Sequence, residues 1–334
     1  LIVNGFDRMA GTNNTFDFIR QHGSALHIAG YSFDSASNEA VINGTISLTD
    51  YDYVDWILGE EGTSTNVFTG TEQTLVKSFL ESGRFLFISG SEIGYDLSGQ
   101  GSTSDHQFYT NYLKADYISD AAGSNVYSGY GANNSIFDGI TGVTYDDGSQ
   151  GTYDVDWPDG IFPVGGASIC AKYDGVNYST QGGMGVEYVG TFGSGNVDGG
   201  LVYLAVGFET IYPESKRNEL MVGIMNLYQS QLGIGDNIPS LMPSSLVINK
   251  LYPNPTNTSF TLNFSSILNE TITITITDIL GRVVNQSTLI SIQNKSSFTW
   301  DGLDQKGQPS PTGLYLVSIS NGKTVQSRKV TLLK

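Results

Sequence analysis

Residues 271–277 read Thr-Ile-Thr-Ile-Thr-Ile-Thr, and this pattern decides the fold of the C-terminal part of the chain. Strict alternation has the period of a β-strand, so we expect the isoleucines to face a core and the threonines to face water. Further strand patterns occupy residues 259–264, 313–319 and 329–333. Turn-forming pairs such as Asp301-Gly302 and Asn321-Gly322 separate them. Short strands at this spacing predict a small all-β, Ig-like sandwich over residues 246–334.

Five motifs follow one another along this part of the chain. They are Tyr252-Pro-Asn-Pro-Thr256, Ile276-Thr-Asp-Ile-Leu-Gly-Arg-Val-Val284, Trp300-Asp-Gly-Leu-Asp-Gln-Lys-Gly307, Pro311-Thr-Gly-Leu-Tyr-Leu316 and Lys329-Val-Thr-Leu-Leu-Lys334. In this order they resemble the type A C-terminal sorting domain of the type IX secretion system. The alternative is an ordinary Ig-like carbohydrate-binding module.

The resemblance implies partners and a location. Residues 246–334 would be recognised by the outer-membrane translocon of a Gram-negative bacterium and removed by a sortase-like protease. The protein would then be secreted, or held on the extracellular face of the outer membrane through lipopolysaccharide.

The charge of the chain changes near residue 240. Residues 1–240 carry 29 acidic and 8 basic residues, whereas residues 241–334 carry 4 acidic and 8 basic residues. The residues at 233–245 are rich in Gly, Pro, Asn and Ser, which predicts a linker between two domains; a long surface loop is the alternative. The net charge of −17 argues against nucleic-acid binding and against an electrostatic grip on anionic membranes. No apolar run approaches the roughly 20 residues that span a bilayer.

Residues 1–232 combine apolar runs with helical patterns. Four runs each end near a glycine and an acidic residue, at 1–7, 54–60, 85–92 and 201–209. Helical periodicity follows at 71–83 and 215–228, and the intervening residues 117–200 are rich in Gly, Asp, Asn and Tyr. Near-continuous apolar strands are typical of a parallel sheet covered on both faces. We therefore expect a doubly wound, mostly parallel α/β domain, in which residues 117–200 form a β-rich insertion or an extension of the sheet.

Two segments of this domain carry a second resemblance. Residues 84–94 and 200–211 resemble the class I glutamine-amidotransferase-like, flavodoxin-like superfamily, and more narrowly modules of large secreted bacterial surface proteins. In that superfamily the turn after the strand holds a catalytic cysteine, but the matching residue here is Glu92. Glu92 is therefore either a carboxylate nucleophile or general base, or a structural residue at a helix end. His106, which follows this turn, is the second catalytic candidate.

Ligands of open parallel sheets bind beyond the carboxyl ends of the strands. The side chains expected there, beside Glu92, are Asp7, Arg8, Glu60, Glu61 and Glu209. An acidic cleft with one arginine suits a polyhydroxylated or cationic ligand, so a glycan is a candidate; the alternative is a set of solvated loop residues and helix caps.

An acidic loop carries a separate hypothesis. Asp146, Asp147, Asp154 and Asp156 lie among glycines, and carboxylate oxygens are the ligands that calcium prefers. A calcium site is therefore a candidate, although the spacing is not that of an EF-hand and a solvated loop is the alternative. No other cofactor is indicated.

Together these patterns favour a secreted or surface-displayed type IX cargo with a non-catalytic binding or structural module. Two alternatives stay open. The first is a hydrolase or lyase that acts on polysaccharide or peptidoglycan through Glu92, and the second is an adhesin or filament subunit.

Overall fold

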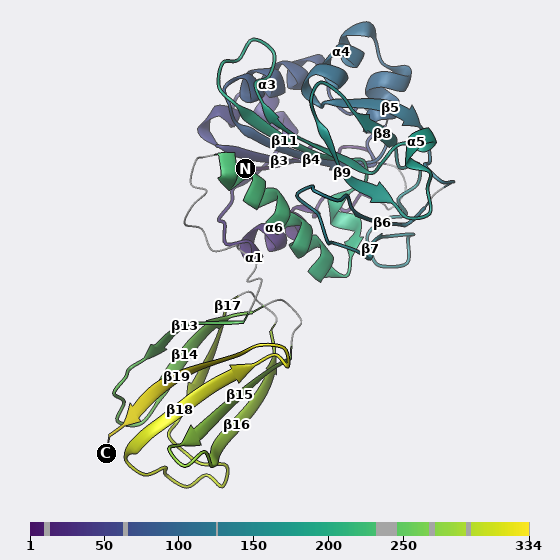
Figure 1. Ribbon diagram of the computed structural model, residues 1–334. Coiled ribbons are helices and arrows are strands. Elements are labelled where there is room, and N and C mark those ends of the chain that lie inside the picture. The colour runs from purple at the N-terminus through teal and green to yellow at the C-terminus, as the bar shows by residue number, and fades with distance from the viewer. Residues whose placement is uncertain are drawn as a thin grey trace. The chain divides into compact units, whose positions relative to one another are not determined.

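The computed structural model describes residues 1–9, 14–62, 66–124, 126–231, 246–266, 271–291 and 295–333. The chain divides into two compact units, Leu1–Asn237 and Ile238–Lys334 (Figure 1). The predicted linker at 233–245 lies outside the described residues. Within the described part, no helix combines the length and apolarity that a membrane span requires.

The first unit is built on a ten-stranded sheet in the order β12-β7-β6-β9-β10-β11-β4-β3-β1-β2. Its strands are β1 (Ile2–Asn4), β2 (Ser35–Ser37), β3 (Tyr53–Gly59), β4 (Phe85–Gly90), β6 (Ser128–Gly131), β7 (Val143–Tyr145), β9 (Ser168–Tyr173), β10 (Gly185–Gly190), β11 (Gly199–Leu204) and β12 (Ile211–Tyr212). A separate pair consists of β5 (Ala115–Ser119) and β8 (Gly160–Pro163).

The prediction of a doubly wound, mostly parallel α/β fold is wrong. Four of the strand pairings in the large sheet are parallel, but five are antiparallel. The chain is mainly β, with several sheets and about 24% helix. The change of direction occurs at β11, where Leu201 pairs with Leu86 in a parallel register and with Tyr188 in an antiparallel one. Residues 117–200, expected as a β-rich insertion or a sheet extension, supply strands that continue the sheet.

Helices flank the strands of this unit. They are α1 (Ile19–Ile28), α2 (Asn38–Ile42), α3 (Gly70–Glu81), α4 (Thr103–Tyr112), α5 (Tyr178–Gln181) and α6 (Glu214–Gln231), with short turns η1 (Leu48–Asp50), η2 (Tyr95–Gln100) and η3 (Phe208–Thr210). Helix α3 begins at a capping box, in which Thr69 and Glu72 satisfy each other's backbone amides. It ends before Gly83, whose positive φ of +82° suits a glycine.

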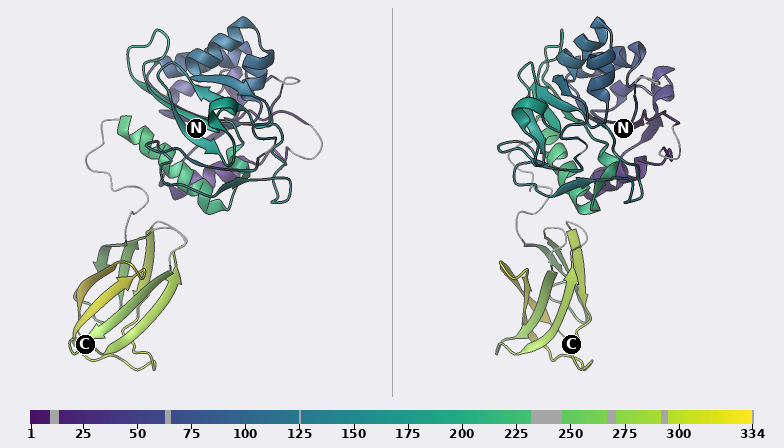
Figure 2. Two further views of the ribbon diagram at one scale, coloured as in Figure 1. Left: turned by 45° about the vertical axis from the view of Figure 1, so that its right-hand side comes forward. Right: turned by 90° about the vertical axis from the view of Figure 1, so that its right-hand side faces the viewer.

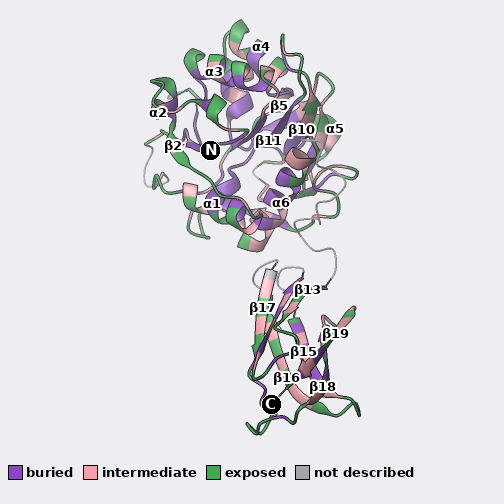
Figure 3. Cartoon of the chain, turned by 90° about the vertical axis from the view of Figure 1, so that its left-hand side faces the viewer, coloured by how far each residue is buried: buried purple, intermediate pink, exposed green. Residues whose placement is uncertain are grey.

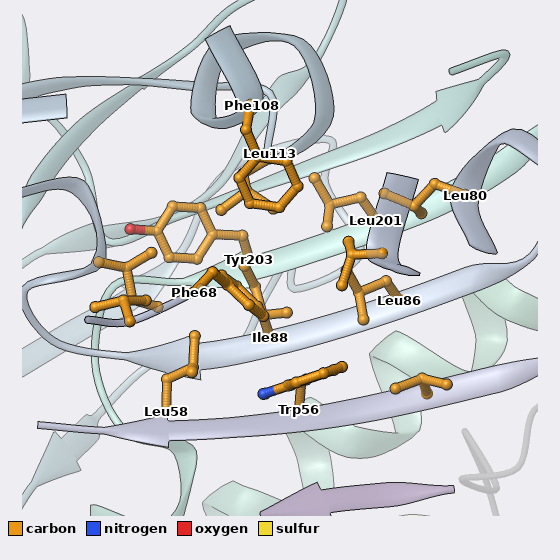
Figure 4. Packing of buried hydrophobic residues seen from close by; sticks show 14 of the residues in the cluster. Trp56, Leu58, Phe68, Leu80, Leu86, Ile88, Phe108, Leu113, Leu201 and Tyr203 are labelled. Atoms are coloured by element: carbon orange, nitrogen blue, oxygen red, sulfur yellow. The ribbon is translucent and has the colours of Figure 1, made fainter. Parts of the chain in front are cut away.

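The core beneath α3 and α4 fills with large side chains. Figure 4 shows Trp56, Ile88 and Tyr203 on neighbouring strands, packed with Phe68 and with the Phe108 ring of α4. Figure 3 shows the buried residues concentrated in the central strands, while exposed residues lie on the outer helix faces and the loops. Because this buried core holds β3 and β4 firmly, the residues just after these strands have well-defined positions.

The second unit consists of two antiparallel sheets, seen from two sides in Figure 2. The three-stranded sheet contains β13 (Val247–Tyr252), β14 (Phe260–Ser265) and β17 (Lys295–Trp300), and the four-stranded sheet contains β15 (Thr271–Asp278), β16 (Val283–Ile290), β18 (Gly313–Ser320) and β19 (Val325–Leu332). As predicted, Ile272, Ile274 and Ile276 are buried. They pack in one cluster with Trp300 of the other sheet.

Candidate functional site

A strained turn places Glu92 directly after β4. Its φ is +60°, in the left-handed region that a non-glycine residue rarely occupies. The amide of Ser91 donates to the carbonyl oxygen of Gly59 at 2.8 Å, so the turn is tied to the end of β3. The adjoining Gly90 is required, because a Cβ there would lie 2.9 Å from that same oxygen. Close packing between two strand ends thus holds Glu92 at the carboxyl edge of the sheet.

Arg8 and Glu92 approach each other above Gly62. A Cβ on Gly62 would lie 2.9 Å from Oε2 of Glu92 and 3.6 Å from Nη1 of Arg8. Nη1 of Arg8 donates to the carbonyl oxygen of Glu60 at 3.0 Å. Oε2 of Glu61 accepts from the amides of Asp7 and Arg8, at 2.7 and 2.9 Å. The loop after β1 is therefore fastened to the loop after β3, which holds the guanidinium of Arg8 near the carboxylate of Glu92.

Several carboxyl groups surround this pair. Burial raises the pKa of Glu92, Arg8 opposes the rise, and Asp120, Asp96 and Asp156 add to it. Burial also raises the pKa of Asp120 and of Asp156. The amide of Asp156 donates to Oε1 of Glu60 at 3.3 Å, so this loop meets the same edge. We call Arg8, Glu60, Glu92, Asp120 and Asp156 the Glu92 site.

An aromatic residue, Trp157, adjoins this site along the chain. It follows Asp156, has a φ of +56° and leaves 49% of its surface exposed. Sequence reasoning missed this residue, although an aromatic in the acidic loop 146–159 was a usable signal.

Three predicted site residues have other surroundings. Asp7 is exposed, and its Oδ2 accepts from Nδ2 of Asn38 at 2.8 Å. His106 is exposed on α4, where its Nδ1 shares a 2.8 Å hydrogen bond with Oγ of Ser98. Glu209 is fully buried in a different cluster. The structure thus brings Arg8, Glu60, Glu61 and Glu92 together, but not the other three side chains.

The cluster around Glu209 is a buried charge network that the sequence did not indicate. Nδ1 of His22 donates to Oδ2 of Asp55 at 2.9 Å, and its Nε2 lies 3.2 Å from Oε2 of Glu209. The hydroxyl of Tyr153 donates to Oε1 of Glu209 at 2.5 Å. Burial acts to lower the pKa of His22, but the two carboxylates outweigh it and raise the pKa to about 9. We call His22, Asp55, Tyr153 and Glu209 the His22 network.

The acidic loop satisfies much of its own hydrogen bonding. Oδ1 of Asp146 accepts from the amide of Gln150, and Oδ2 accepts from the amide and hydroxyl of Thr152, all at 2.7–2.8 Å. Asp147 accepts from Ser149, and Asp154 accepts from the hydroxyl of Tyr127. Across the described residues, no group of three or more His, Cys, Asp or Glu side chains is arranged to hold a metal ion. Three of the four acids proposed for calcium, Asp146, Asp147 and Asp154, thus accept hydrogen bonds from protein groups.

Comparisons with known proteins identify the second unit. Residues 250–332 match the family described as "Secretion system C-terminal sorting domain". None of the curated proteins compared with the chain matches it. The family match does not reach residues 1–232, and it leaves their resemblance to the amidotransferase-like, flavodoxin-like superfamily unsupported.

Solved structures show only weak likeness. PorZ, titled an essential bacterial surface component of the type-IX secretion system of Porphyromonas gingivalis, has 20% identity over 25% of this chain and 11% of its own, with a TM-score of 0.21. Dimeric latent PorU from Porphyromonas gingivalis has 14% identity over 55% of this chain and 14% of its own, with a TM-score of 0.24. The N-terminal domain of mmIFT52 has 15% identity over 69% of this chain and 96% of its own, with a TM-score of 0.43. These TM-scores are too low to assign a fold.

Residues 250–332 are therefore a C-terminal sorting domain. The protein is a cargo of the type IX secretion system, secreted and attached to the cell surface.

Proposed function

We propose that the first unit is a non-catalytic module that binds a glycan at the Glu92 site. The observation that carries the proposal is the half-buried Glu92 carboxylate beside Arg8, with the exposed indole of Trp157 next to Asp156. Carboxylates accept hydrogen bonds from sugar hydroxyls, and a guanidinium donates to ring and hydroxyl oxygens. An indole offers a flat apolar face for the C–H face of a sugar ring.

The surroundings of Glu92 favour binding over catalysis. A carboxylate nucleophile needs no base, but hydrolysis also requires a second group that donates or accepts a proton near the reacting bond. The second catalytic candidate, His106, is bonded to Ser98 on the exposed face of α4. The group beside Glu92 is instead the cation of Arg8, which opposes the rise in its pKa.

One observation favours a hydrolase as the second candidate. Glycoside hydrolysis uses two carboxyl groups, one of them with a raised pKa. Burial raises the pKa of Glu92, and Asp120 and Asp156 are close enough to raise it further. This pattern would suit an acid and base pair acting on polysaccharide or peptidoglycan.

Binding and turnover can be measured on the same variants. The purified full chain is titrated with polysaccharide and peptidoglycan fragments, and product release is followed in parallel. We expect Glu92→Gln and Trp157→Ala each to weaken glycan binding about tenfold, which corresponds to about 1.4 kcal/mol. Asp198→Asn is the matched control, because Asp198 is exposed and lies near Gly83, at the opposite end of β4.

Two results would contradict the binding module. If no glycan fragment binds the parent protein, the proposal fails. If the parent releases product and Glu92→Gln lowers turnover by about 10²-fold or more with unchanged melting temperature, the hydrolase replaces it.

The sorting domain adds partners to this proposal. We propose that residues 246–334 bind the outer-membrane translocon and are removed by a sortase-like protease that cuts in the predicted linker 233–245. The net charge of +4 on residues 241–334, against −21 on residues 1–240, supports two parts with separate roles.

A further inference from the structure

A groove of about 570 Å³ opens on the second unit. It lies between the connection that joins β15 to β16, the segment 304–306, and the segment 309–315 that leads into β18. Its apolar lining includes Ile279, Leu280, Val283 and Leu314, which are 76%, 74%, 51% and 42% exposed. A group of large aliphatic side chains exposed at one place indicates an interaction site, whereas single exposed aliphatic residues are ordinary.

The backbone of this groove is held in place before any partner binds. Oδ1 of Asp278 accepts from the amides of Leu280 and Arg282, at 2.9 and 3.0 Å, and Oδ2 accepts from Nε of Arg282 at 2.7 Å. On the other wall, Oδ1 of Asp304 accepts from the amides of Lys306 and Gln308, both at 2.8 Å. Both turns are thus stabilised internally, which lowers the conformational entropy lost on binding.

The charged side chains that line the groove determine which charges a binding partner would contact. Asp278 forms an ion pair with Arg282, and the negatively charged carboxylate of Asp304 accepts hydrogen bonds from two amides of its own turn. Lys306 lines the groove, and no ion pair of its ammonium group occurs among the described residues. The groove therefore presents an aliphatic surface whose rim carries two acidic and two basic side chains, of which Asp278 and Arg282 form an ion pair.

We propose that this groove binds an apolar polypeptide segment of the export machinery that carries an acidic side chain opposite Lys306. The inference rests on the sorting-domain match and not on glycan binding by the first unit. The match supplies the occupant, because a unit that directs export must be recognised by a component of that machinery. The aliphatic lining defines the apolar character of the segment, and the ammonium group of Lys306, outside any ion pair among the described residues, is the place for its acidic side chain. The acidic first unit of a second copy is a less suitable occupant of the groove, because contact with acidic groups would not bury the four aliphatic side chains against an apolar surface.

Export of the full chain tests the groove. The chain, placed behind an N-terminal export signal, is produced in a type IX-competent bacterium, and its amount at the cell surface is measured. We expect the double variant Ile279→Ser/Leu280→Ser to lower surface delivery at least tenfold. The matched control is Ile290→Ser/Val325→Ser, which alters two aliphatic residues of the same unit, 60% and 66% exposed, that do not line the groove. Because all four side chains are exposed, we expect both purified variants to melt as the parent does.

Charge reversal and cross-linking test the occupant. Lys306→Glu should lower delivery, whereas Lys323→Glu, at an exposed residue that does not line the groove, should not. A photo-reactive residue at position 280 should cross-link to a component of the export machinery during delivery. Cross-links to a second copy, or to the first unit, would overturn the assignment of the occupant.

Two further outcomes separate this inference from the sorting role. If deletion of residues 246–334 stops export but Ile279→Ser/Leu280→Ser is delivered normally, the groove is not the recognition surface and the sorting role stands. If the control variant is blocked equally, the groove has no special role and the inference is wrong.

Discussion

The His22 network makes the stability of the first unit fall in alkaline solution. His22 is fully buried between Asp55 and Glu209, which raise its pKa from 6.5 to about 9. A pKa that is higher in the folded state means that folding favours the protonated imidazole. The stabilisation is complete below about pH 6.5, the pKa in the unfolded chain, and it is lost as the pH rises through about 9.

The magnitude follows from the pKa difference. A difference of one pH unit corresponds to about 1.4 kcal/mol, so a rise from 6.5 to about 9 corresponds to about 3 kcal/mol. No correction for solvent screening is needed, because the His22 side chain has no exposed surface. A loss of this size is a large fraction of the stability of an ordinary domain.

Urea denaturation of the full chain between pH 6 and pH 10, read by pulse proteolysis, measures this loss for the first unit. The parent should lose about 3 kcal/mol more over this range than His22→Gln, which removes the titrating group. His27→Gln is the matched control, since His27 is exposed on the same helix α1 and should keep the pH dependence of the parent. If the parent and His22→Gln lose stability equally, the reasoning is refuted. Should His22→Gln fail to fold, Asp55→Asn provides a second test, because removing one carboxylate should shift the loss to a lower pH.

Two further predictions follow from the turn after β4 and from the sorting domain. Glu92→Gly should stabilise the first unit by up to about 1 kcal/mol in urea denaturation, because glycine adopts a φ of +60° without the steric cost that a side chain brings. A destabilised variant would mean that the contacts of the Glu92 carboxylate contribute more than the backbone strain costs. A signal-bearing reporter fused to residues 233–334 should reach the surface of a type IX-competent cell. Mass spectrometry should show that it has lost about 90 residues by cleavage in the predicted linker. A reporter that stays periplasmic, while a known sorting domain is exported, would contradict the sorting role.

The candidate site was only partly predictable. The short turn Gly90–Gly94 and the acidic residues after each apolar run placed Arg8, Glu60, Glu61 and Glu92 at one edge, because neighbouring parallel strands end together. Glu209 was assigned to this edge by the same rule, but η3 turns its side chain inward to His22. The direction of a loop side chain depends on tertiary packing, which the order of residues along the chain does not reveal.

Local pattern by itself predicted four of the seven strands of the second unit, β14, β15, β18 and β19, but not β13, β16 or β17. The alternation at 271–277 buries Ile272, Ile274 and Ile276, and the ordered motifs mark a sorting domain, because alternation and turn residues act over a few positions. Tertiary structure alone decided the direction of strand pairing in the first unit, where β11 joins parallel β4 to antiparallel β10. It also decided the His22 network, whose partners lie 33 and 187 positions from His22. Both depend on contacts between distant segments, and such contacts form only once the hydrophobic core has brought those segments together.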